Sequence, residues 1–103
     1  MSRQLLLDAA DLIEERGLAK DTFEDQDGRV CVLAAINLAA GLTVDGWGTG
    51  SGVVEARGQL VDYLGIEQRD DEWWSAGRAL VCWSDTEGRT AEVVARELRR
   101  AAD

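Results

Sequence analysis

Acidic residues are the commonest chemically active side chains in this sequence, and three groups of neighbouring carboxylates stand at residues 14–15, 24–25 and 70–72. Acid–base catalysis usually needs a carboxylate in a partly buried setting that shifts its pKa. None of the three groups has apolar residues on both sides, which favours solvated helix faces and helix caps. The chain contains no histidine, so Ser-His-Asp and Cys-His pairs and histidine metal ligands are excluded. The sequence therefore predicts no catalytic residue and favours a protein that is not an enzyme.

Two loop patterns come close to known ligand-binding loops but lack residues that those loops require. Glycines stand at every second position from 46 to 52. A phosphate-binding loop needs a lysine after its last glycine, and none is present, while the Gly-x-Gly-x-x-Gly spacing also fails. The acidic turns at Gly28 and Gly88 lack the first and last ligands of a calcium loop. We therefore predict no cofactor and no metal ion.

The two cysteines, Cys31 and Cys82, lie in apolar stretches of the sequence. No secretory signal is recognisable, because Asp8 and Asp11 interrupt the apolar run near the N-terminus. We therefore expect a cytoplasmic protein with two buried, reduced thiols, and a disulfide is the less favoured alternative. A second alternative makes Cys31 a nucleophile, since Arg29 and a nearby helix start would both lower its thiol pKa.

Three of the four tryptophans fall within eleven residues, on one predicted helix. Trp73 and Trp74 point about 100° apart on such a helix, so both cannot face one core. Trp47 stands in the glycine-rich loop, where an aromatic side chain either folds back onto the core or is offered to a partner. The alternative is that all the clustered indoles are structural anchors. The predicted candidate interaction surface consists of Trp47, Trp73, Trp74, Asp70, Asp71 and Glu72.

The net charge of the chain is −9, from 20 acidic and 11 basic residues. An acidic domain repels the phosphate backbone and anionic lipids, so we predict that it binds neither nucleic acid nor membrane. No apolar run approaches the ~18 residues of a membrane span. A basic protein partner is electrostatically allowed, and an array of acids that mimics nucleic acid is a variant of this idea.

Hydrophobic residues recur at spacings of three and four in several segments, which predicts helices. These helices span residues 4–16, 30–40, 53–64, 71–83 and 90–102. Segment 30–40 is apolar except at Asn37, which is typical of a buried central helix. Thr90 is the predicted cap of the last helix, while Gly17, Gly41 and Gly65 are predicted to end three others.

The predicted fold is an all-α, compact single domain over residues 1–103, with about five helices around segment 30–40. A chain of 103 residues suffices for one hydrophobic core but not for two. A minor hairpin near residues 22–32 is a further expectation, because Asp27-Gly28 is a turn signal between two short apolar flanks.

Four motifs are distributed over residues 5–101. They are Leu6-x-x-Ala9-Ala10-x-x-Ile13-x-x-x-Gly17, Asp27-Gly28-Arg29-x-Cys31-x-Leu33-x-Ala35-Ile36, Trp83-Ser84-Asp85 and Gly88-Arg89-Thr90-x-Glu92-Val93-Val94. Together they resemble a family of small domains of unknown function found in actinobacteria and their bacteriophages. Members of that family have Trp-Asn-Asp at the third motif and an aromatic residue after the first glycine, where this chain has Ser84 and Leu18. The resemblance implies no established activity. The motif order indicates fold-specifying roles, in which Asp85 pairs with Arg29 or Arg89.

Three functions remain open at the level of sequence. The favoured hypothesis is a small, acidic, protein-binding accessory module, encoded by a phage and acting on a host or defence factor. It draws on the small size, the acidity and the tryptophan cluster. The second is a small-ligand binder or enzyme that uses a groove beside the helix carrying Trp73 and Trp74. The third is a structural or assembly component, for which a homo-oligomer is an option.

Overall fold

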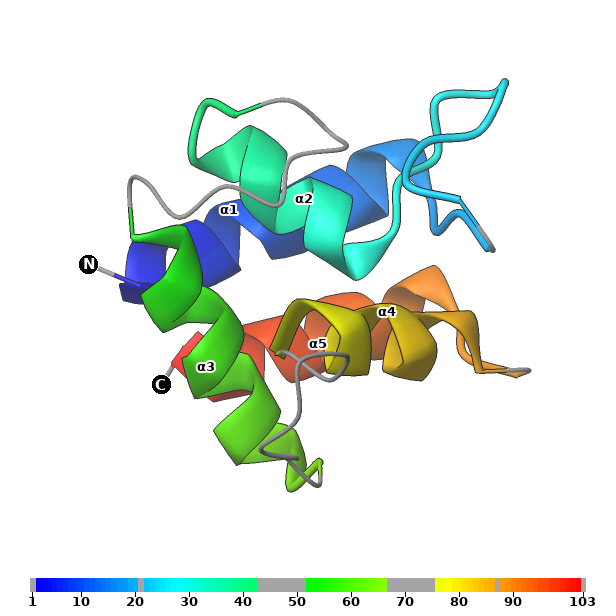
Figure 1. The fold of residues 1–103 in the computed structure, drawn as a ribbon. Coiled ribbons are helices and arrows are strands. Elements are labelled where there is room, and N and C mark those ends of the chain that lie inside the picture. Colours follow the sequence, from blue (N-terminus) through cyan, green and yellow to red (C-terminus); the bar gives the residue numbers. More distant parts are fainter. Residues whose placement is uncertain (1, 21, 43–51, 67–75, 87, 103) are drawn as a thin grey trace.

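A computed structural model of the chain describes residues 2–20, 22–42, 52–66, 76–86 and 88–102. The chain order of the helices is α1 (Ser2–Arg16), α2 (Val32–Ala39), α3 (Val53–Leu64), α4 (Ala76–Asp85) and α5 (Ala91–Ala102). Extended pairing within the described ranges amounts to two isolated bridges. The predicted all-α architecture is therefore confirmed (Figure 1).

Helix α2 is the most completely buried helix of the described chain, as its apolar sequence predicts. Every residue from 32 to 37 is buried, including the polar Asn37. The helix contacts α1, α3 and α4. The helix ends at Ala39, and just beyond Gly41 the amide of Leu42 donates to the carbonyl of Asn37 at 2.9 Å. This bond, which spans five residues, belongs to the glycine-terminated motif that commonly closes helices.

Helix α1 packs most extensively against α5, and it also contacts α2 and α3. Ala9 and Ala10 are fully buried on α1, and small side chains allow neighbouring helices to approach closely. Helix α3 packs across the start of α1 and the end of α5 (Figure 1). The amide side chain of Gln59 holds this junction by donating to the carbonyl of Ala101 at 2.6 Å.

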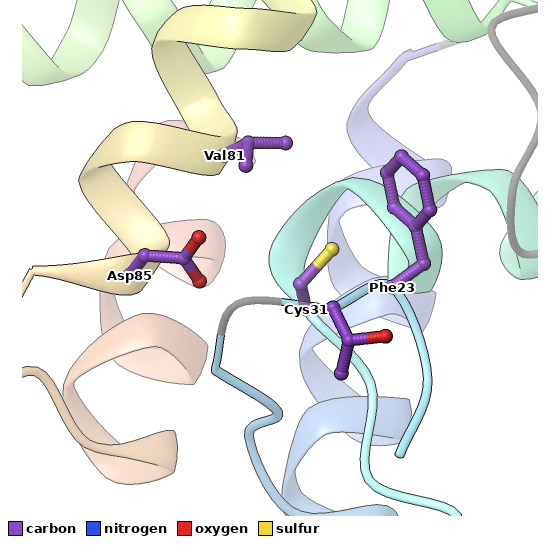
Figure 2. Close-up of a pocket in the computed structure, with 5 residues that line it drawn as sticks. Phe23, Cys31, Val81 and Asp85 are labelled. Carbon is purple, nitrogen blue, oxygen red and sulfur yellow. The ribbon is translucent and has the colours of Figure 1, made fainter.

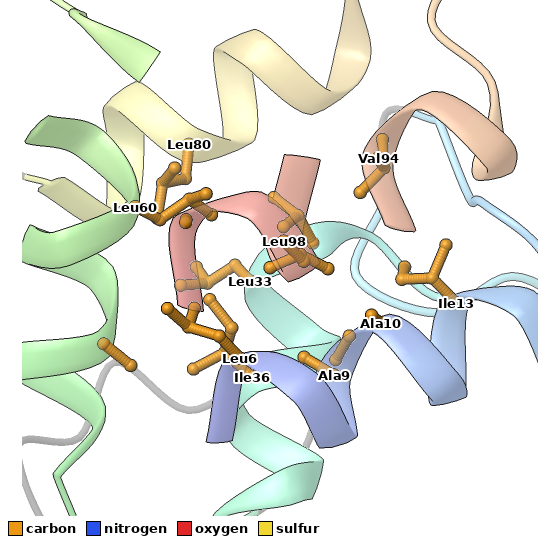
Figure 3. Close-up of a cluster of buried hydrophobic side chains, with 14 of the residues drawn as sticks. Leu6, Ala9, Ala10, Ile13, Leu33, Ile36, Leu60, Leu80, Val94 and Leu98 are labelled. Atoms are coloured by element: carbon orange, nitrogen blue, oxygen red, sulfur yellow. The ribbon is translucent and has the colours of Figure 1, made fainter. Parts of the chain in front are cut away.

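All five helices contribute side chains to one hydrophobic core (Figure 3). Burying one leucine side chain completely in such a core stabilises the fold by about 1.5–3 kcal/mol relative to leaving that side chain exposed. No helix in the described ranges has the length and hydropathy needed to cross a membrane. The fully buried leucines of this core are Leu6, Leu33, Leu60, Leu80 and Leu98.

The helix boundaries follow the predicted capping residues. The hydroxyl of Thr90 accepts a bond from the amide of Val93 at 3.2 Å, so Thr90 caps α5 as predicted. Gly65 closes α3 with φ near +70°, and the amide of Ile66 reaches the carbonyl of Val61 at 3.3 Å. Helix α1 begins at Ser2, two residues earlier than predicted.

Helix α4 departs from its prediction. It extends to Asp85, so Ser84 belongs to the helix instead of the predicted turn. The predicted first residues of this helix, 71–75, lie outside the described chain. Cys82 is exposed, which corrects the expectation of two buried thiols, while Cys31 is buried as predicted. The reason is helical spacing, because Leu80 and Ser84 are four residues apart and both face inward, which turns Cys82 to the opposite side.

The predicted hairpin near residues 22–32 is reduced to bridges at Val30, which pairs antiparallel with Glu24 and parallel with Leu18. Strand pairing stops there because α2 begins at Val32. Gly17, whose φ is +91°, ends α1 and passes close to Arg29. A Cβ atom at Gly17 would lie 3.0 Å from Cγ of Arg29, so a side chain there would crowd Arg29 in addition to straining the backbone.

Candidate functional site

A pocket of about 310 Å³ lies between the segment that precedes α2 and the second half of α4. We call it the α4 pocket, and Figure 2 shows its lining side chains converging from these two sides. Phe23 and Val81 provide apolar walls, and both are partly buried against the core. The other lining residues within the described part of the chain are Thr22, Cys31 and Asp85.

Lys20 and Ser84 fix the two sides of the α4 pocket relative to one another. The ammonium group of Lys20 donates to the carbonyl oxygens of Ser84 at 2.6 Å and Thr86 at 3.0 Å. A cation at this position satisfies carbonyls that the end of a helix leaves without intrahelical partners. In the other direction, the buried hydroxyl of Ser84 accepts from the amide of Val32 at 3.4 Å. Hydrogen bonds from Lys20 and from Val32 therefore both connect this part of the chain to the end of α4.

Asp25 organises the turn that carries the pocket residues on the α2 side. One carboxylate oxygen accepts from the backbone amides of Asp27 at 2.9 Å and Arg29 at 3.0 Å, and the other accepts from the Arg29 guanidinium at 2.6 Å. Desolvation acts to raise the pKa of Asp25, but the bonds donated by Arg29 and Asp27 outweigh it and lower that pKa. The turn is thus held by its own charged residues.

Cys31 lines the pocket as a neutral thiol. Burial raises its pKa, and the nearby negative charge of Asp85 acts in the same direction. The sulfur accepts a bond from the amide of Ala34 at 3.4 Å and caps the start of α2. The guanidinium of Arg29 is directed to Asp25 and Asp27. Because a nucleophilic cysteine needs a lowered pKa, this environment favours the structural role over the nucleophilic alternative.

Trp83 is anchored on the opposite side of α4 from the pocket walls. The guanidinium carbon of Arg89 lies 4.3 Å from the centre of the Trp83 ring, within cation–π range. Nε of Arg89 also donates to the Trp83 carbonyl at 2.8 Å. The predicted pairing of Asp85 with Arg29 or Arg89 is therefore wrong in this structure, because Arg89 engages Trp83 and Arg29 engages the turn acids.

A second hollow, of about 460 Å³, lies along α1 and α5 and is lined largely by charged side chains. Arg99 pairs there with Asp11 at 3.0 Å and also with Glu14, which raises the pKa of its guanidinium. These charges compensate one another across the two helices. The two acidic and two basic side chains that line the second hollow therefore leave no net charge among its described lining residues. Its lining residues are Glu14, Ala91, Glu92, Arg96 and Arg99.

The residues that sequence reasoning singled out as an interaction surface lie outside the described chain. Sequence reasoning in turn missed the α4 pocket, although two of its members stand in the recognised motifs, Cys31 in the second and Asp85 in the third. Within the described ranges, no three cysteine or acidic side chains lie close enough together to hold a metal ion. The undescribed surface residues are Trp47, Asp70, Asp71, Glu72, Trp73 and Trp74.

Comparison with protein families places the chain without assigning it an activity. The model of a family of unknown function, DUF6197, matches residues 1–103. No curated protein and no solved structure matches the chain. The predicted resemblance to a family of small domains of unknown function is confirmed, since the match covers all four motifs. The chain belongs to DUF6197, a family of unknown function.

Proposed function

We propose that this domain is a protein-binding module that receives one side chain of a partner protein in the α4 pocket. The observation that carries this proposal is the pocket itself, with a volume of about 310 Å³ between Phe23 and Val81. Ligand pockets span about 300–1,000 Å³, so this one stands at the small end of the range. A hollow of that size suits a single anchoring side chain, which is how many protein interfaces concentrate their binding energy.

The rigidity of the pocket supports this role. Its two sides are joined through the bonds of Lys20 to α4 and of Ser84 to α2, so the walls are held before a partner arrives. A preformed pocket avoids the entropic cost of ordering loops on binding. Burial raises the pKa of Cys31, so this lining residue is suited to packing against a bound side chain more than to acting as a nucleophile.

Filling the pocket from within tests the proposal. Val81→Phe adds bulk at the pocket wall, and Val54→Phe makes the same change at a side chain that is 50% exposed on α3. We expect immobilised wild-type and Val54→Phe domains to retain the same partner from a lysate of the source cells, while Val81→Phe loses it. Thermal unfolding of all three verifies that they are folded. Equal recovery of every captured protein by Val81→Phe would contradict the proposal.

A small-molecule ligand is the second candidate, because a hollow of this size beside α4 can also hold a small compound. A panel of metabolites separates the two functions. A compound that raises the melting temperature of wild type and Val54→Phe, but not of Val81→Phe, would favour the small ligand over a protein side chain.

A further inference from the structure

We draw no further inference here: the strongest candidate, the charged hollow along α1 and α5, carries none because its arginines, Arg96 and Arg99, already pair with carboxylates of their own chain and nothing in the described residues shows what would occupy it.

Discussion

The ammonium group of Lys20 lies 2.6 Å from the carbonyl oxygen of Ser84, although the two residues are 64 positions apart in the sequence. Lys20 is the single lysine of the chain. Its contact joins the turn region after α1 to the end of α4, the helix that carries Val81 and Asp85 of the α4 pocket. This bond fixes the end of α4 relative to the segment that leads to Phe23 and Cys31.

Replacing Lys20 tests the contribution of this bond. Lys20→Met keeps most of the stem but removes both charge-assisted bonds to the end of α4. We expect a loss of about 1.5–3 kcal/mol in the free energy of unfolding, the range for hydrogen bonds to charged groups. Urea denaturation measures it. Arg3→Met, at an exposed residue of α1, removes the same charge and should cost less than ~0.5 kcal/mol. Equal stability of the two variants would show that Lys20 does not hold α4.

The cap of the last helix gives a second prediction. Thr90→Ala removes the hydroxyl that accepts from the amide of Val93, so we expect α5 to lose about 1 kcal/mol of stabilisation. The melting temperature should fall for Thr90→Ala and stay close to wild type for Thr90→Ser, which keeps the hydroxyl. A serine variant as unstable as the alanine variant would place the effect in the methyl group instead of the cap.

The two thiols should react at very different rates. Cys82 is exposed on α4, while Cys31 is buried and its pKa is raised, so its thiolate forms only at a pH above the ordinary value. We expect one fast-reacting thiol per folded chain with a neutral disulfide reagent, and a second only after unfolding. Cys82→Ser should remove the fast phase, and Cys31→Ser should leave it intact. A fast phase that persists in Cys82→Ser would contradict the burial of Cys31.

The turn held by Asp25 predicts a pH dependence of stability. The pKa of Asp25 is lowered in the folded chain, so its contribution is fully present above the pKa of the unfolded state, whose ordinary value is 3.8. That contribution is lost as the pH falls through the lower folded value. We therefore expect Asp25→Asn to be less stable than wild type at pH 7 and the difference to shrink below pH ~4.

Thermal unfolding between pH 2 and pH 7 measures this convergence. Asp27→Asn is the control, because the Asp27 carboxylate makes a single, exposed ion pair with Arg29 at 3.2 Å and accepts no backbone bond in the turn. A difference between Asp25→Asn and wild type that stays constant over this range would show that the carboxylate charge is not what stabilises the turn.

The interior of the fold could be predicted because it depends on local rules. Segment 30–40 is apolar on all sides, and it forms the buried helix α2. Thr90 and Gly65 mark helix ends because caps and left-handed glycines act within a few residues of their own position. The predicted end of α4 was wrong at a residue with a long-range contact: Ser84, predicted in a turn, belongs to α4, and its hydroxyl accepts from the amide of Val32 at the start of α2.

The α4 pocket could not be predicted for the same reason. Phe23 and Val81 are 58 positions apart, and nothing in either local pattern indicates that they face one another. Arg29 and Arg89 were assigned to Asp85 from the order of motifs. In the folded chain each guanidinium instead meets a neighbour within a few residues, Asp25 in one case and Trp83 in the other. Motif order carries no information about which charged groups become neighbours.

By itself, the sequence determined the class of fold, the positions of most helix ends and the acidic character of this DUF6197 member, because periodicity, capping and composition are local or additive properties. Only the tertiary structure decided that Lys20 closes the end of α4, that Cys82 faces outward, and that Phe23, Val81 and Asp85 border one hollow. A pocket is formed by side chains from distant segments, and their meeting depends on how the helices pack, which no single stretch of the chain encodes.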